Sequence, residues 1–177
     1  MDPVNDLLKD PAIRAYLHRL VKDEGLNLIE RFPRSGEHSD EDLAAKTGIN
    51  LNSVRHTLYT LYEKRLAEYH RIKNNETGWL TYLWQLRTDN IFNAIREDME
   101  LVLEKLERRG KYEEENDFFI CKDCQVLFTF PLAMNCDFNC PRCGKAVTHF
   151  DNDMLLKSLK ERIYSIKKSL GHALPIG

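Results

Sequence analysis

The chain has 177 residues, of which 42% are hydrophobic and 31% are charged, enough for one or two small packed domains. Its 26 Lys and Arg residues are balanced by 28 Asp and Glu residues, giving a net charge of −2. This balance argues against a stand-alone protein that holds duplex DNA tightly on a strongly basic surface. The polar start of the chain carries no signal-peptide pattern, and no apolar run has the length of a membrane span. We therefore expect a cytoplasmic protein without a membrane partner.

Residues 1–87 have the element order of a winged-helix domain with an additional leading helix. Apolar residues spaced three and four apart after Pro11 predict a first helix, and residues 23–32 predict a second. Ser39 precedes an acidic turn and predicts the start of a short helix that ends at Gly48. A longer helix over residues 50–64 completes a helix-turn-helix. A generic small α+β domain is the plainer alternative.

A β-hairpin is predicted after the helix-turn-helix, with strands at 66–73 and 79–86 joined by turn-forming residues at 74–78. Alternation predicts that one face of the second strand covers the helices, namely Leu80, Tyr82, Trp84 and Leu86. Trp79 and Leu83 then point outward. We expect them near two basic residues of the first strand, Arg71 and Lys73. An outward aromatic beside basic residues suits a protein interface or an unpaired base, unless the aromatics merely pack.

The helix over residues 50–64 is the candidate recognition helix. Its core-facing residues are expected to be Leu51, Val54, Leu58 and Leu61. Arg55 and Asn52 lie on the exposed side and are types that contact base edges. A helix that contacts DNA phosphates normally carries more Lys and Arg residues than this single Arg, so sequence-specific duplex binding is not favoured.

Two amphipathic helices are predicted beyond residue 87, and their apolar residues repeat with the same 3-4-3-4 spacing. In residues 88–112 the stripe consists of Phe92, Ile95, Met99, Val102 and Leu106. In residues 151–177 it consists of Leu156, Leu159, Ile163, Ile166 and Leu170. We expect the two helices to pack on each other, although each could instead dock on a partner or on the segment between them. Residues 113–116 are predicted to form a polar hinge.

Two C-x2-C units, Cys121/Cys124 and Cys140/Cys143, are separated by residues 125–139. This spacing is typical of a zinc site, because two such turns aim four thiolates at one tetrahedral ion. Four thiolates leave no open position, so one structural zinc ion is expected in a ribbon over residues 117–150. Cys136 or His149 could replace a ligand, and redox chemistry at the first pair is a minor alternative. Gly144 is expected in a left-handed conformation after the second pair.

Several stretches together resemble the alpha subunit of archaeal transcription factor E, a relative of the large subunit of eukaryotic TFIIE. They are Asp23-Glu24-Gly25, Asn52-Ser53-Val54-Arg55, residues 58–62, Gly78-Trp79 with Tyr82 and Trp84, and both cysteine pairs. The resemblance covers nearly the whole chain. It implies a factor that joins RNA polymerase, TATA-binding protein and the TFIIB-like factor on promoter DNA and assists promoter melting. A beta subunit is a further candidate partner.

The sequence thus predicts a mainly α protein with small sheets: an extended winged helix at 1–87, a helical linker at 88–116, the ribbon, and a terminal helix at 151–177. We expect a nucleoid-associated initiation factor that contacts polymerase or the non-template strand through Arg55, Arg71, Lys73, Trp79 and Tyr82. The alternative is a winged-helix repressor with a structural zinc ribbon. No nucleophile motif, P-loop or open metal site is present in the sequence, so we do not expect an enzyme.

Overall fold

The computed structural model describes residues 7–33, 35–73, 75 and 78–172, and the chain divides into two compact units, Met1–Arg96 and Glu97–Gly177. Each unit is described by itself. Among the described residues, no helix is both long enough and apolar enough to cross a membrane. The predicted hairpin loop at 74–78 lies mostly outside the described residues, as does the end of the chain after residue 172.

The N-terminal unit opens with helix α2, Pro11–Arg31, whose first backbone N–H groups are capped by the Asp10 carboxylate. The helix is broken at Lys22, where φ is 58° and ψ is −168°, so the two predicted helices are two halves of one interrupted element. A non-glycine residue in this region is strained, and the surrounding structure must hold it there. Gly25 follows the break, and an added Cβ there would lie 2.3 Å from Val21 Cβ.

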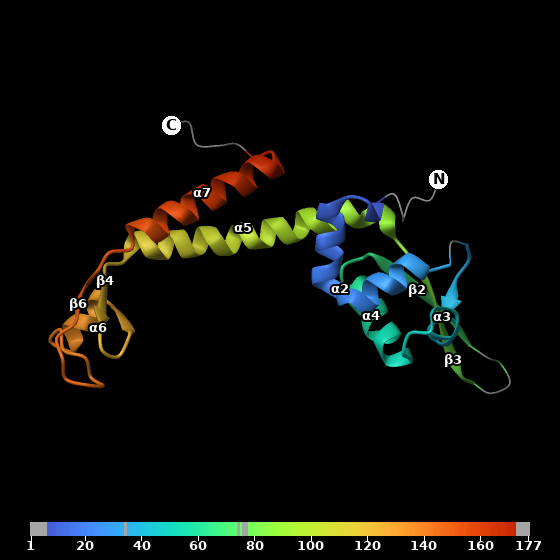
Figure 1. Ribbon diagram of the computed structural model, residues 1–177, viewed down its shortest axis with the longest axis horizontal. Coiled ribbons are helices and arrows are strands. Elements are labelled where there is room, and N and C mark those ends of the chain that lie inside the picture. Colours follow the sequence, from blue (N-terminus) through green and yellow to red (C-terminus); the bar gives the residue numbers. More distant parts are fainter. Residues whose placement is uncertain (1–6, 34, 74, 76–77, 173–177) are drawn as a thin grey trace. The chain divides into compact units, whose positions relative to one another are not determined.

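The helix-turn-helix consists of α3, Asp40–Thr47, and α4, Leu51–Glu63 (Figure 1). Ser39 caps α3 by accepting a hydrogen bond from the Asp42 backbone N–H, and Gly48 ends it at φ 74°, as predicted. Asn50 caps α4. The predicted core positions of α4 are confirmed except for Leu51, which is half-buried, while Thr57 is buried instead.

A three-stranded antiparallel sheet completes this unit, in the order β1-β3-β2. Its strands are β1, His38–Ser39, β2, Ala67–Lys73, and β3, Leu80–Leu86. Trp84 lies opposite Tyr69 in the β2–β3 register. The unit therefore has the winged-helix order of helices followed by a hairpin, with its core between the helices and the base of the hairpin.

Two predicted side-chain positions on β3 are wrong. Leu80 is exposed rather than packed on the helices, because it lies toward the hairpin tip, beyond the reach of the core. Leu83 is half-buried rather than outward, opposite Ser39 of β1 and His70 of β2. The short strand β1, which the sequence did not indicate, supplies one of those two neighbours.

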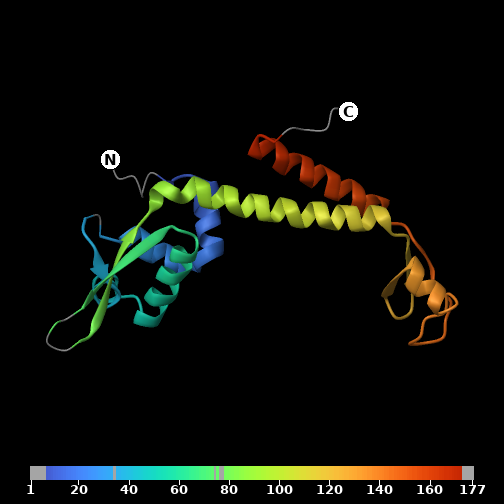
Figure 2. The same cartoon turned by 180° about the vertical axis from the view of Figure 1, so that it is seen from behind.

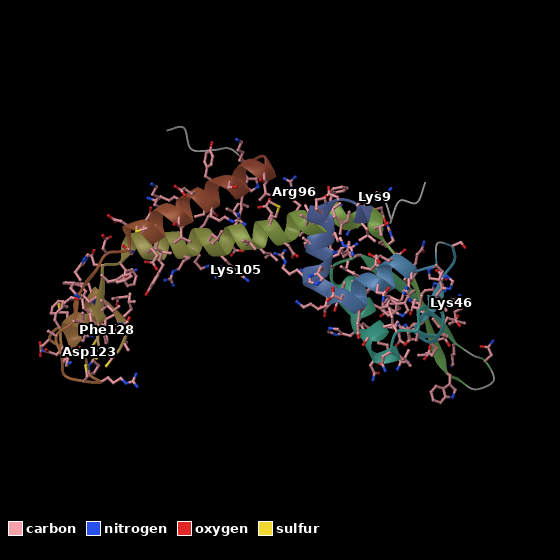
Figure 3. The ribbon with its side chains drawn as sticks, in the orientation of Figure 1. Lys9, Lys46, Arg96, Lys105, Asp123 and Phe128 are labelled. Atoms are coloured by element: carbon pink, nitrogen blue, oxygen red, sulfur yellow. The ribbon has the colours of Figure 1, made fainter. Side chains whose placement is uncertain are left out.

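In the C-terminal unit, two helices run side by side in both views (Figures 1 and 2). Helix α5 spans Ile91–Glu115, and its first residues and the preceding 3-10 turn at Thr88–Asn90 still belong to the N-terminal unit. Helix α7 spans Asp153–Leu170. The expected pairing is confirmed by a shared apolar cluster of Leu103, Ile166 and Leu170, flanked by Met99, Leu106 and Ile163. Lys105 lies on the side of α5 away from α7 (Figure 3).

The predicted stripe on α5 is only partly right. Phe92 is 64% exposed and Val102 is also exposed, whereas Leu103 is buried against α7. Gly110 then comes close to Ile163, because an added Cβ there would lie 3.6 Å from its Cδ1 atom. The contact face therefore follows residues 99, 103, 106 and 110.

Ion pairs along one edge fix the antiparallel register of α5 and α7. Lys160 contacts Glu114 at 2.7 Å, and Lys167 contacts Glu107 at 2.6 Å. The partners on each helix are seven residues apart, which is the spacing of flanking charges in a coiled coil. His172, just beyond α7, contacts Glu100 at 2.8 Å and continues the same row.

The expected hinge at 113–116 is wrong, since α5 continues to Glu115 and Glu113 is buried. The Glu113 carboxylate accepts a hydrogen bond of 2.6 Å from the Asn152 side-chain amide and also contacts Arg109. Asn152 immediately precedes α7, so this contact joins the end of α5 to the start of α7. The run of charged residues at 113–115 suggested an exposed hinge, but Glu113 is buried and accepts a hydrogen bond.

Replacing Glu113 with Ala is expected to lower the free energy of unfolding of the C-terminal unit by about 1–3 kcal/mol, because the Asn152 amide keeps the backbone carbonyl of residue 113 but loses its shorter hydrogen bond, to the carboxylate. Chemical denaturation of the metal-loaded protein measures the change. Glu115→Ala removes a neighbouring exposed carboxylate and should cost less than about 0.5 kcal/mol. Equal losses for both variants would contradict the role of the buried contact.

Candidate metal centre and wing surface

A second antiparallel sheet, in the order β5-β4-β6, carries the cysteines. Its strands are β4, Phe118–Cys121, β5, Val126–Thr129, and β6, Thr148–Phe150. A short helix α6, Phe130–Asn135, lies between β5 and the second cysteine pair and was not predicted. The first cysteine pair forms the turn between β4 and β5, and the second precedes β6, so the unit has the ribbon arrangement expected from the sequence.

The four thiols of Cys121, Cys124, Cys140 and Cys143 converge, with all sulfur atoms within 4.8 Å of one another. The Sγ atoms of Cys121 and Cys143, one from each turn, are 3.5 Å apart. Cys121 and Cys140 are buried, Cys124 is half-buried and Cys143 is exposed. Among the described residues, the cluster that could hold a metal ion consists of these four cysteines, without Cys136 or His149.

The two turns have matching backbones. In the first, the Gln125 N–H donates to the Cys121 carbonyl at 2.8 Å, and in the second the Gly144 N–H donates to the Cys140 carbonyl at 2.7 Å. In each turn, the residue after the second cysteine has a positive φ: 54° at Gln125 and 72° at Gly144. The expectation for Gly144 is confirmed. Gln125 was missed, although its position relative to Cys124 is the same as that of Gly144 relative to Cys143.

The donor set fits a thiophilic cation. Burial raises the pKa of the Cys140 thiol, but backbone N–H groups of Arg142 and Cys143 outweigh it and lower that pKa to about 7. Hydrogen bonding among the crowded thiols, first from Cys143, raises the pKa of Cys124 to about 12. Four thiolates at this separation repel one another unless a positive ion lies among them. The geometry therefore accommodates one four-coordinate metal ion with thiolate ligands.

An ion pair links the two turns on the outside of the cluster. Lys145 Nζ lies 2.7 Å from the Asp123 carboxylate, and both side chains are exposed. Figure 3 shows Asp123 in the first turn, with Phe128 on the adjacent strand β5. The hydrogen bond to Asp123 is the main reason that the pKa of Lys145 lies above its ordinary value, so the ammonium stays charged beside the cluster.

The two residues outside the cluster have other surroundings. Cys136 follows α6, and its N–H donates to the Ala133 carbonyl at 3.2 Å. The His149 ring packs edge-on against Phe119 at 5.6 Å between ring centroids. Phe119 also contacts Phe130 and Phe138, so aromatic side chains form much of the small ribbon core.

On the winged helix, the predicted wing residues divide into two groups. Trp79 is 76% exposed, just before β3. Tyr82 is half-buried and packs edge-on against Tyr69, with 5.1 Å between the ring centroids, as part of a packed aromatic group. Arg71 and Lys73 are exposed on β2, and the ion pairs found among the described residues do not involve them. Since directly opposed residues share a face, Arg71 lies beside Tyr82 rather than beside Leu83.

An aromatic cluster between α4 and the hairpin was not anticipated. Trp84 is buried at its centre and contacts Tyr59 at 5.3 Å, Tyr62 at 6.4 Å and Tyr69 at 4.9 Å. Tyr59 and Tyr62 lie on α4 and keep about half of their surface exposed. Their spacing of three along the helix could have indicated a shared face, but the register of the hairpin was needed to place Trp84 against it.

The predicted contact residue Arg55 is engaged within the protein. Its guanidinium contacts the Asp40 carboxylate through Nε and the Glu41 carboxylate through Nη2, the latter at 2.7 Å. Hydrogen bonding to Asp40 raises the pKa of Arg55 further above its ordinary value. The only Lys or Arg residue in α4 is thus neutralised by the first turn of α3.

Comparisons with known proteins extend this picture. A family model described as the TFIIE alpha subunit matches residues 11–116. Transcription factor E of Methanoregula boonei is 70% identical over 173 residues, covering 98% of this chain and 100% of that protein. The chain belongs to the transcription factor E family. Transcription factor E of Methanospirillum hungatei is 56% identical over 94% of this chain and 96% of that protein, and that of Halobacterium salinarum 42% identical over 93% and 95%.

Membership of this family supports a role in transcription initiation. The family-model match ends at residue 116, while these transcription factor E relatives also span the cysteine-bearing segment. They are named as transcription factors and not as enzymes. A solved structure titled as a possible transcriptional regulator from Methanosarcina mazei has a TM-score of 0.42 at 16% identity, covering 59% of this chain and 85% of that one.

Proposed function

We propose that this protein binds RNA polymerase in the preinitiation complex, through the clamp and the stalk, and promotes or stabilises promoter melting. The observation that carries the proposal is similarity to transcription factor E over 98% of the chain, ribbon included. TATA-binding protein, the TFIIB-like factor and promoter DNA are the other partners proposed, with a beta subunit as a further candidate. Such a protein works in the cytoplasm, at the nucleoid.

The wing is the proposed point of contact near the edge of the melted region. Trp79 presents an exposed indole, and Arg71 and Lys73 present charges on the same hairpin. An indole can stack on a base of the non-template strand while basic residues neutralise phosphates. Melting would then follow from population shift, because the factor binds the open state of the promoter complex better than the closed state. Tyr82 contributes by holding the aromatic packing beneath the wing.

The ribbon is proposed to hold one structural zinc ion through Cys121, Cys124, Cys140 and Cys143. Bound zinc supplies a cross-link between the two turns, which stabilises a module with few other core residues. The four cysteines fill the coordination shell, so this site supports folding and not catalysis. The Lys145–Asp123 pair holds the turns together from outside.

Trp79→Ala is expected to leave the protein bound to polymerase but to reduce promoter opening severalfold, since stacking contributes about 1–3 kcal/mol per base. Co-purification of zinc-loaded protein with RNA polymerase from the same cells measures the first property. Permanganate reactivity of promoter thymines measures the second. Thr81→Ala, which changes an exposed residue of β3 two positions after Trp79, is the matched control.

Failure of the wild-type protein to co-purify with polymerase would overturn the proposal. If the wild type instead shifted one specific duplex in a salt-resistant manner, the protein would be a winged-helix repressor. Retention of the wild type with loss of the Trp79→Ala variant would place the indole in the polymerase interface.

A further inference from the structure

The acidic first turn of α3 encloses the cation of the recognition helix. Asp40 and Glu41, named here the acid clamp, contact different nitrogens of the Arg55 guanidinium. The Asp40 side chain is only 14% exposed in this arrangement, whereas that of Arg55 remains 43% exposed. The guanidinium is thus near the surface, where DNA could reach it, but two of its three nitrogens already contact carboxylates.

Local structure holds the clamp in place independently of Arg55. Ser39 caps α3, and the positive end of the helix dipole favours carboxylates in the first turn. Burial raises the pKa of Asp40, but hydrogen bonding with Glu41 and Arg55 outweighs this and lowers it, which keeps Asp40 ionised at neutral pH. The same hydrogen bonding with Asp40 raises the pKa of Glu41. Asp40 therefore carries a negative charge beside Arg55 under the conditions in which DNA is bound.

Helix α4 has no other Lys or Arg to replace Arg55, and its last residue is the acid Glu63. A duplex approaching α4 meets a guanidinium paired with two carboxylates, whose negative charges repel phosphates. We propose that Asp40 and Glu41 mask Arg55 and thereby suppress binding of α4 to the phosphate backbone of duplex DNA. The masking is independent of polymerase binding, so it can hold or fail separately from the function proposed above.

The test compares two variants of equal charge change in the zinc-loaded full-length chain. The clamp variant is Asp40→Asn with Glu41→Gln. The control variant is Asp42→Asn with Glu63→Gln, which neutralises one acid on each of the same helices; the contacts found for described residues do not join either acid to Arg55. Fluorescence anisotropy with a short duplex of arbitrary sequence is measured over a range of salt concentrations.

The clamp variant is expected to bind duplex DNA about tenfold more tightly than the control variant at low salt, because one charge-assisted phosphate contact becomes available. Its plot of log affinity against log salt should be steeper by about one unit. Adding Arg55→Gln to the clamp variant should abolish both gains. The same substitution in the wild type should change duplex binding little, since Arg55 is already occupied.

Equal affinities for the clamp and control variants would overturn the masking proposal, as would a gain that survives Arg55→Gln. If circular dichroism shows that the clamp variant is not folded, Glu41→Gln alone decides the question. Glu41 is more exposed than Asp40, and its replacement leaves Asp40 in contact with Arg55. A gain of the same sign but smaller size supports masking, and no gain over Asp42→Asn contradicts it.

Discussion

A Cys140→Ser variant is expected to lose its metal ion and the folded ribbon while keeping a folded winged helix. The buried core of the ribbon consists of Cys121, Ala133, Cys140 and Val147, with a few half-buried aromatics around it. So small a core cannot compensate for the loss of a structural zinc ion, whose binding contributes roughly 10–16 kcal/mol in comparable peptides. The winged helix has its own, larger cluster of buried residues and should not depend on the metal.

Zinc content and a two-dimensional amide NMR spectrum measure this result. Zinc should fall from one equivalent to none, and amide signals of the ribbon should collapse while those of α2 to α4 stay in place. Cys136→Ser is the matched control, because Cys136 lies in the same ribbon but outside the metal cluster. Full zinc occupancy in Cys140→Ser would contradict the ligand set, and loss of zinc in Cys136→Ser would implicate that thiol.

Features that depend on neighbouring residues were predictable from the sequence. Ser39 before an acidic turn and Gly48 after Thr47 are capping signals, and the structure places α3 between them. The metal cluster was predictable for the same reason, because the C-x2-C spacing alone brings two thiols together. In both cases the chemistry is decided within a few residues, so distant packing does not alter it.

Features that depend on a distant partner were harder to predict. Helix α5 carries two overlapping apolar stripes, one through Phe92 and Val102 and one through Leu103. Periodicity alone could not choose between them, since the choice depends on where α7 lies. The burial of Glu113 has the same origin, because its partner Asn152 is remote in sequence. Likewise, the acid clamp on Arg55 required the relative placement of α3 and α4.

Trp84→Ala is expected to lower the free energy of unfolding of the N-terminal unit by about 3–5 kcal/mol. Trp84 is 2% exposed at the centre of β3, where it pairs with His38 on one side and Tyr69 on the other. Its removal leaves a cavity against Tyr59, Tyr62 and Tyr69 and breaks the contact between α4 and the hairpin. For a domain of this size such a loss lowers the unfolding midpoint by at least about 10 °C.

The second tryptophan, Trp79, provides the control for this experiment. Trp79→Ala removes an equally large side chain that is 76% exposed, so it should cost less than about 1 kcal/mol in the same thermal unfolding measurement. Because the two tryptophans lie on the same hairpin, the pair separates the structural use of an aromatic side chain from its use in binding. Similar losses of stability would mean that the wing indole is a packing residue, and the proposed contact with a base would then lose its physical basis. A stable Trp79→Ala variant that opens promoters poorly would assign the exposed indole to binding and the buried one to the fold.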